Sequence, residues 1–259
     1  MCSEINWADY VYKRHHLNAC RHCGCDYWGM VKVTTKLVTY DVYMALLDIE
    51  GSLVPIIQKT LNFDGPIATD FVRLWRAKQM ERAAISNSLA NRRTSFRECT
   101  AIALDYCLGH YGLVLLPRIY RNLVFAWDTM TPWAEADSAI AKVKAKGCQT
   151  GILSNGDQEM LEAVASNFSP NTFDHILSSE TAGQYKPHPS VYEMPTAILG
   201  VVKEDLVHVA GSPNDVLGTI AAGIKCIWSN RRGERLLDPA YPPTYEVSDL
   251  IGIADLIDA

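Results

Sequence analysis

The stretch Lys36-Leu-Val-Thr-Tyr-Asp-Val-Tyr-Met-Ala-Leu-Leu-Asp48 decides the fold. Its apolar, β-branched run predicts a buried strand, which ends in a carboxylate, Asp41, where the strand would meet a loop. In open α/β sheets ligands bind outside the carboxyl ends of the strands, so Asp41 lies where chemistry is expected. One such Asp is weak evidence by itself, because many strands end in an Asp that only caps a loop.

Three later blocks repeat this arrangement of a strand or loop that ends in polar side chains. They are Gln149-Thr-Gly-Ile-Leu-Ser-Asn-Gly156, Tyr185-Lys-Pro-His-Pro189 and Val207-His-Val-Ala-Gly-Ser-Pro-Asn-Asp215. The first ends in Ser154 and Asn155, the second carries Lys186 on a Pro-flanked loop, and the third leads to Asp215. Four such blocks in this order are far more specific than any one of them.

The order of predicted elements indicates an α/β fold with an inserted helical cap. Amphipathic helices are predicted over 52–61, 68–89, 95–111 and 117–127. From Pro132 onward the pattern alternates as helix 134–146, strand 148–154, helix 157–166, strand 174–178, helix 189–199, strand 206–210, helix 214–223 and strand 224–229. This alternation implies a Rossmann-like, doubly wound parallel sheet with helices on both faces. We therefore expect an N-terminal extension of 1–30, a core of 31–51 and 132–259, and a cap of 52–131 between the first and second strands.

Composition limits the classes of partner. Of 259 residues, 48% are hydrophobic and 20% charged, which is ordinary for a globular protein. A net charge of -5 without a basic stripe argues against nucleic acid as a partner. No apolar run approaches the roughly 20 residues that span a bilayer, and no apolar signal core precedes the domain. We expect no membrane partner and a cytoplasmic location.

The N-terminal extension is rich in cysteine. Cys20-x-x-Cys23-x-Cys25, with His15, His16 and His22 nearby, has the composition of a metal site. No second C-x-x-C pair completes a tetrahedral set at the usual spacing. We favour an extension without stable structure over a structural zinc site.

The four blocks resemble the haloacid dehalogenase superfamily, and in particular the (S)-2-haloacid dehalogenases (haloacid dehalogenase type II). The resemblance covers roughly residues 31–259. It includes Leu74-Trp-Arg-Ala-Lys-Gln-Met80 in the cap, which is similar to the helix that carries the family's halide-binding arginine. It also includes Phe173-Asp-His-Ile-Leu-Ser-Ser179 and Tyr185-Lys-Pro-x-x-x-Val-Tyr192. The resemblance implies an aspartate nucleophile, a small-molecule substrate and a homodimer formed through the cap.

Two positions favour a dehalogenase over the superfamily's magnesium phosphatases. Those phosphatases usually carry Asp-x-Asp, and the second Asp protonates the leaving alkoxide. Here that position is Tyr43, which cannot serve at neutral pH. Magnesium demands an octahedral oxygen shell, yet Gly211 stands where an acidic ligand is usual and only Asp215 remains. We expect no metal and no other cofactor.

The resemblance assigns a role to each site residue. Asp41 is the nucleophile, Lys186 keeps it ionised, Asp215 anchors Lys186 and helps activate water, and Arg76 takes the departing halide. Ser154 and Asn155 bind the substrate carboxylate and orient the site. The residues expected to line the substrate pocket are Tyr43, Met44, Met80, Phe96, Tyr192 and Ser212. Plainer interpretations stay open, among them an exposed loop lysine at 186, a helix N-cap at 215, a polar helix face shared by Arg73, Arg76 and Arg82, and core packing of the apolar set.

Several residues depart from the dehalogenase pattern. Ala45 replaces a threonine, Ala210 replaces a serine, Ser212 replaces the asparagine thought to position water, and Asn214 replaces a tryptophan. These changes alter the polarity of the pocket. Hydrolysis of short (S)-2-haloalkanoic acids to (R)-2-hydroxy acids is the first hypothesis. The alternatives are a ring hydrolase of the azetidine-2-carboxylate type, a relict phosphatase, and a non-catalytic binding protein on the same fold.

Overall fold

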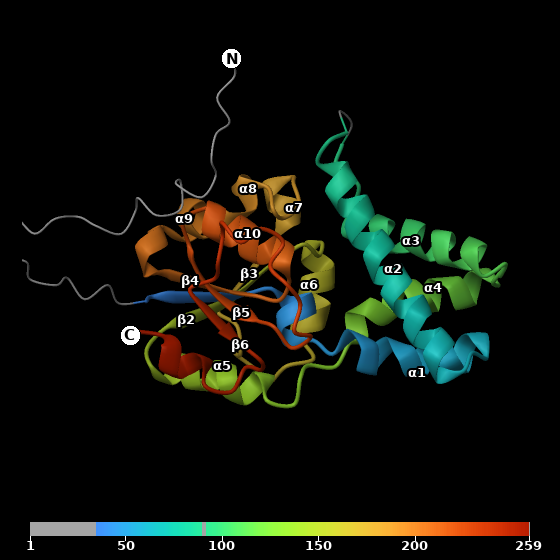
Figure 1. Cartoon of the computed structure of the whole chain (residues 1–259), viewed down its shortest axis with the longest axis horizontal. Coiled ribbons are helices and arrows are strands. Elements are labelled where there is room, and N and C mark those ends of the chain that lie inside the picture. The colour runs from blue at the N-terminus through green and yellow to red at the C-terminus, as the bar shows by residue number, and fades with distance from the viewer. Residues whose placement is uncertain (1–34, 90–91, 259) are drawn as a thin grey trace, which may run out of the picture. The chain divides into compact units, whose positions relative to one another are not determined.

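A computed structural model describes residues 35–89 and 92–258 of the chain. The described part contains a six-stranded parallel sheet in the order β3-β2-β1-β4-β5-β6 (Figure 1). The strands are β1 (Leu37–Tyr40), β2 (Gln149–Ser154), β3 (His175–Ser178), β4 (Leu206–Ala210), β5 (Lys225–Ser229) and β6 (Tyr245–Val247). The predicted parallel α/β sheet is confirmed. The extension at 1–30 with its cysteines lies outside the described residues.

The order of the strands puts Asp41 at the point where the sheet reverses direction. From β1 the chain proceeds to β2 and β3 on one side, and then returns to place β4 on the other side of β1. Ligands of doubly wound sheets bind at such a switch point, outside the carboxyl ends of the strands. Asp41 follows β1 there, and Asp215 follows β4.

Helices cover both faces of the sheet, as predicted. In Figure 1, α5 (Ala136–Ala145) lies below the sheet, while α9 (Met194–Leu199) and α10 (Pro213–Ala221) lie above it. The remaining core helices are α6 (Gln158–Ala165), α7 (Ser179–Ala182) and α8 (Pro189–Tyr192), with short 3-10 turns at Lys203–Asp205 and Ile253–Leu256. No helix of the described residues is long and apolar enough to cross a membrane.

One expectation about local structure was wrong, and two short elements were missed. The predicted helix 189–199 is broken into α8 and α9, because Pro195 lacks the N–H that a continuous helix needs and its ring crowds the preceding turn. The strand β6 and the helix α7 were not predicted. Each has only three or four residues, too few for a periodic pattern to appear.

The segment between β1 and β2 is helical, as expected. It contains α1 (Ile49–Leu61), α2 (Gly65–Ser86), α3 (Phe96–His110), α4 (Pro117–Phe125) and the 3-10 turn η3 (Ala126–Thr129). Helices α1 and α2 begin three residues before the predicted starts. Their N-caps are Asp48, which accepts from the Gly51 N–H at 2.8 Å, and Asp64, which accepts from the Ile67 N–H at 2.9 Å. The cap limits at 52 and 131 stay a prediction.

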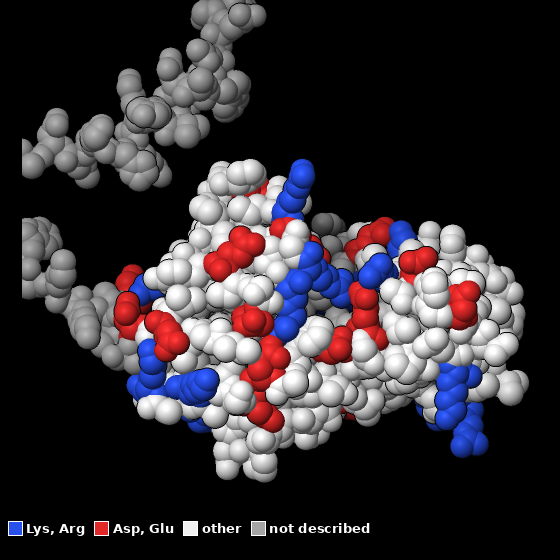
Figure 2. All heavy atoms as spheres, turned by 60° about the horizontal axis from the view of Figure 1, so that its bottom comes forward, with Lys and Arg blue, Asp and Glu red and all other residues white. Residues whose placement is uncertain are grey.

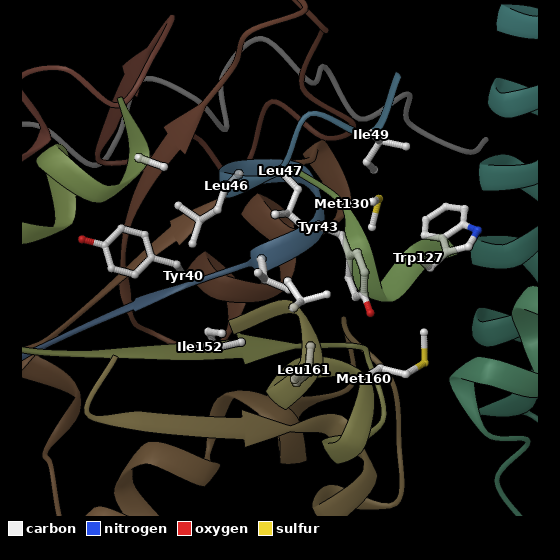
Figure 3. Packing of buried hydrophobic residues seen from close by; sticks show 14 of the residues in the cluster. Tyr40, Tyr43, Leu46, Leu47, Ile49, Trp127, Met130, Ile152, Met160 and Leu161 are labelled. Atoms are coloured by element: carbon white, nitrogen blue, oxygen red, sulfur yellow. The ribbon is translucent and has the colours of Figure 1, made fainter. Parts of the chain in front are cut away.

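A buried cluster supports the loop after Asp41. Figure 3 shows the Tyr43 ring of that loop beside Trp127 and Met160 of α6, and Leu46 and Leu47 of the same loop belong to the same buried cluster. The ring centroids of Tyr43 and Trp127 are 6.2 Å apart, and Tyr43 is fully buried. The loop therefore rests on packed aromatic and aliphatic side chains, which fixes the backbone next to Asp41.

The surface carries mixed charge. On the face seen in Figure 2, acidic and basic side chains lie interspersed, and neither sign covers that face continuously. This mixture agrees with the small negative net charge of the whole chain.

Candidate active site

Both oxygens of the Asp41 carboxylate are held in place. Asp41 precedes a π-helical turn, Val42–Leu46, and its Oδ2 accepts from the Met44 N–H at 3.0 Å. Its Oδ1 accepts from the Ser154 hydroxyl at 2.8 Å, across from the end of β2. The loop-capping interpretation therefore describes one oxygen only. The other contact joins residues 113 positions apart, which a simple loop cap does not explain.

Lys186 lies in the interior, between two carboxylates. Its Nζ is 3.8 Å from Asp41 Oδ1 and donates to Asp215 Oδ2 at 3.0 Å. The residue is 7% exposed, so it is not an exposed loop lysine. Its backbone N–H donates to Asn155 Oδ1 at 2.8 Å, which assigns Asn155 a part in holding this loop.

Asp215 is the buried anchor of this ion pair. Its Oδ1 accepts from the Tyr192 hydroxyl at 2.8 Å. Burial by itself would raise the pKa of Asp215, but the Lys186 ammonium and His208, with the hydrogen bonds from both, together outweigh it and hold the pKa well below the usual range. Asp215 is not the N-cap of α10, because Ser212 occupies that position and its hydroxyl accepts from the Asp215 N–H.

Sequence reasoning missed His208, a fully buried residue in the middle of β4. Its Nε2 lies 3.0 Å from both Lys186 Nζ and Asp215 Oδ2. Its Nδ1 lies 2.9 Å from the hydroxyl of Thr39, the residue opposite it on β1. The available signal was a single titratable side chain within the otherwise apolar run Leu-Val-His-Val-Ala.

Arg76 is the arginine of α2 that reaches the site. Its guanidinium lies over the rings of Tyr43 and Trp127, at 5.5 and 5.8 Å from their centroids, and donates to Gln79 Oε1 at 2.6 Å. Burial lowers the pKa of Arg76 to about 10, and the nearby Asp41 charge opposes that shift. Its Nε is buried without a hydrogen-bond partner among the described residues. By contrast, Arg73 pairs with Glu50, and Arg82 donates to the Thr94 hydroxyl.

A cavity of about 270 Å³ joins these groups. The predicted site residues that line it are Asp41, Tyr43, Met44, Arg76, Met80, Asn155, Lys186, Ser212 and Asp215. Helix α2 adds Ala77, Glu81 and Ala84, so the wall has contributions from both the helical segment and the sheet edge.

Three predicted site residues do not line this cavity. Ser154 lies behind Asp41 and contacts it by the hydrogen bond above. Phe96 is buried behind Tyr43, with ring centroids 5.5 Å apart, and Tyr192 bonds to Asp215. Phe96 and Tyr192 were expected to line the pocket, and in the structure they do not. Both side chains support residues that do line the cavity.

The residues present do not fit a magnesium ion. Among the described residues, no group of three or more His, Cys, Asp and Glu side chains could hold a metal. A Cβ added to Gly211 would lie 2.3 Å from Ala45 N, so no acidic side chain fits there without moving the Asp41 loop. The cation between Asp41 and Asp215 is the Lys186 ammonium, whose distances to both carboxylates are given above.

Comparisons with known proteins show the family of this chain. The model of the haloacid dehalogenase-like hydrolase family matches residues 42–223. The chain is 30% identical to the (S)-2-haloacid dehalogenase of Pseudomonas sp. (strain YL) over 86% of its length and 94% of that protein. It is 31% identical to (S)-2-haloacid dehalogenase H-109 of Pseudomonas putida, over 84% and 96%. The fold matches the L-2-haloacid dehalogenase from Xanthobacter autotrophicus with a TM-score of 0.78, at 23% identity over 86% of this chain and 98% of that one. The chain therefore belongs to the haloacid dehalogenase-like hydrolase family.

Proposed function

We propose that this hydrolase converts short (S)-2-haloalkanoic acids to (R)-2-hydroxy acids through an ester on Asp41, without a metal. The observation that carries the proposal is the Lys186 ammonium between Asp41 and Asp215, at 3.8 and 3.0 Å. This cation places a positive charge beside the carboxylate that acts as the nucleophile. The names of the relatives, (S)-2-haloacid dehalogenases, support the class of substrate.

In the first step, an oxygen of Asp41 attacks C2 of the substrate. A carbon–oxygen bond forms as the carbon–halogen bond breaks, and the halogen leaves as halide. Arg76 faces this cavity with a charge that no acidic side chain of the described residues pairs with, so it can receive the halide. Halide is a weak base and needs no proton, which suits a site with Tyr43 in place of an acid. Burial raises the pKa of Tyr43, so it is an even weaker acid than free tyrosine.

In the second step, water attacks the side-chain carbonyl carbon of the Asp41 ester. The bond between that carbon and the ester oxygen breaks, and the product alkoxide takes a proton that the water gives up. Asp215 lines the cavity beside Lys186, and we assign it a part in orienting this water. One displacement at C2 inverts that centre and the ester cleavage does not touch it, so (S)-substrate yields (R)-product.

The test compares halide and phosphate release by the same preparation. We expect halide from (S)-2-chloropropionate and 2-bromoacetate, unchanged by EDTA, and none from the (R)-enantiomer. A generic phosphoester with magnesium and azetidine-2-carboxylate serve as the competing substrates. Magnesium-dependent phosphate release without halide release from any haloacid would refute the proposal. If the enzyme opens the ring of azetidine-2-carboxylate and releases no halide, the proposed haloacid substrate is refuted, whereas the ester on Asp41 remains the proposed intermediate.

A further inference from the structure

A buried imidazole stands behind the Lys186 ammonium and outside the cavity wall. His208 contacts three polar atoms: Lys186 Nζ and Asp215 Oδ2 at 3.0 Å, and Thr39 Oγ1 at 2.9 Å. It does not line the 270 Å³ cavity, so substrate does not reach it. The proposed reaction gives this residue no role.

The donors of Lys186 favour one tautomer of this imidazole over the other. An ammonium has three N–H donors and no acceptor. The described acceptors around Nζ are Asp215 Oδ2, His208 Nε2 and, at 3.8 Å, Asp41 Oδ1. Nε2 also lies 3.0 Å from Asp215 Oδ2, so in the other tautomer an Nε2–H would donate to that carboxylate and Lys186 would lose this acceptor. For Nε2 to accept from Lys186 it must carry no hydrogen, and Lys186 then donates to both Nε2 and Asp215. The ring proton then lies on Nδ1 and is donated to the Thr39 hydroxyl, whose oxygen can accept it.

The charges around His208 favour this neutral form. The titratable or charged groups that face it are Lys186 from its loop, Asp41 after β1, Asp215 of α10, Tyr192 of α8, and Cys226, its neighbour on β5. Burial, and then the adjacent Lys186 ammonium, lower the pKa of His208 below its usual 6.5. A second proton would face the ammonium at 3.0 Å and remove the acceptor that Lys186 uses.

We propose that His208 is a positioning residue of this site, whose neutral imidazole accepts a hydrogen bond from Lys186 and orients the ammonium so that it also faces Asp41. This inference rests on the proposed function. With Nε2 absent, one N–H of a buried ammonium would lose its partner, and Lys186 would turn toward Asp215, its closer carboxylate. Asp41 would lose the positive charge that now lies 3.8 Å from its Oδ1.

The tautomer gives a direct test that needs no turnover. Proton–nitrogen correlation NMR of protein with ¹⁵N-labelled histidine distinguishes a protonated from an unprotonated ring nitrogen, and the His208→Phe variant assigns the signal. At pH 7 we expect His208 to be protonated on Nδ1 alone. His208→Gln assigns the same signal if His208→Phe does not fold. A proton on Nε2, in either the other tautomer or the imidazolium, would overturn the proposal.

Kinetics separates positioning from packing. His208→Phe keeps a planar ring without the acceptor, and we expect it to lower kcat for halide release by about 10²-fold with little change in KM, a loss typical of a misplaced group. His208→Gln restores an acceptor and should recover part of the lost kcat. His175→Phe, on β3 beside Gln149, is the matched control and should leave kcat unchanged. Wild-type kcat in His208→Phe, or no recovery in His208→Gln, would contradict the proposal.

The acid side of the pH profile adds a readout that packing would not move. In the wild type kcat should fall as the pH drops through the His208 pKa, because imidazolium cannot accept from Lys186. This decline should be absent from His208→Gln, and its persistence there would count against the proposal. If the wild type releases no halide from any haloacid, the proposed function fails, while the NMR measurement still decides the hydrogen bond between Lys186 and His208.

Discussion

Gly211→Ala should damage this protein far more than its single added methyl suggests. The new Cβ would lie 2.3 Å from Ala45 N and from the Met44 carbonyl carbon, and 2.5 Å from Met44 Cβ. Ordinary carbon contacts begin near 3.4 Å, so the π-helical turn after Asp41 must retreat by about 1 Å. Such overpacking costs roughly 1–3 kcal/mol of unfolding free energy. The same displacement stretches the 3.0 Å bond from the Met44 N–H to Asp41, and a shift of this size lowers kcat by about 10²-fold.

The assay pairs urea unfolding with initial rates of halide release. Gly109→Ala is the matched control, because nothing lies within 4 Å of a Cβ at that position of α3. It should leave kcat unchanged and raise the unfolding free energy by about 0.5–1 kcal/mol, the usual gain for alanine in a helix. Gly211→Asp should lose activity with or without magnesium. Wild-type kcat and stability in Gly211→Ala, or magnesium-dependent activity in Gly211→Asp, would refute the steric reasoning.

Four further outcomes follow from the site. Lys186→Ala should lower kcat at least about 10²-fold while EDTA leaves the wild type unchanged; inhibition by EDTA would point to a metal. Asp41→Asn should abolish turnover with the fold intact, and excess wild-type enzyme in ¹⁸O-water should give a first product without solvent label. Asp157→Ala should cost about 1–3 kcal/mol in urea unfolding, because this carboxylate pairs with Arg93 and accepts two backbone N–H bonds at the start of α3; an unchanged midpoint would argue against that contact. The unfolding free energy should fall as the pH drops below about 6.5, because unfolded His208 binds a proton that the folded state excludes, and His208→Phe should flatten this slope.

The sequence was sufficient where a signal repeats along the chain. Alternating strands and amphipathic helices predicted the parallel sheet, and β4 was predicted at its observed bounds, 206–210. Polar residues at strand ends predicted a site at one edge of the sheet, because parallel strands end there. The resemblance to the family supplied the expectation that Lys186 would lie between Asp41 and Asp215, as it does. Arg76 was expected in the site because the segment that carries it resembles the family's helix with the halide-binding arginine.

The sequence was insufficient where the role of a residue depends on a contact with a residue that is distant along the chain. Phe96 and Tyr192 were expected to line the substrate pocket. The periodicity of a helix indicates which side chains are buried, but it does not indicate which residues pack against them. The contact between Thr39 and His208 joins residues 169 positions apart, and no local pattern reports it. The break at Pro195 had a sequence signal in the proline itself, but α1 continues through Pro55, so a proline alone does not decide where a helix breaks.

The connection from β4 to α10 explains how this site can work without a metal. At Gly211 the backbone of the Asp41 loop approaches so closely that no acidic side chain fits, which removes a ligand that magnesium would need. Asp215 remains, and a cation on another loop, Lys186, reaches the gap between the two carboxylates. A metal ion would order its own oxygen ligands, whereas a lysine depends on fixed acceptors to aim its hydrogens. His208 is one of those acceptors, and for this reason we expect the chemistry at Asp41 to depend on a residue that no substrate touches.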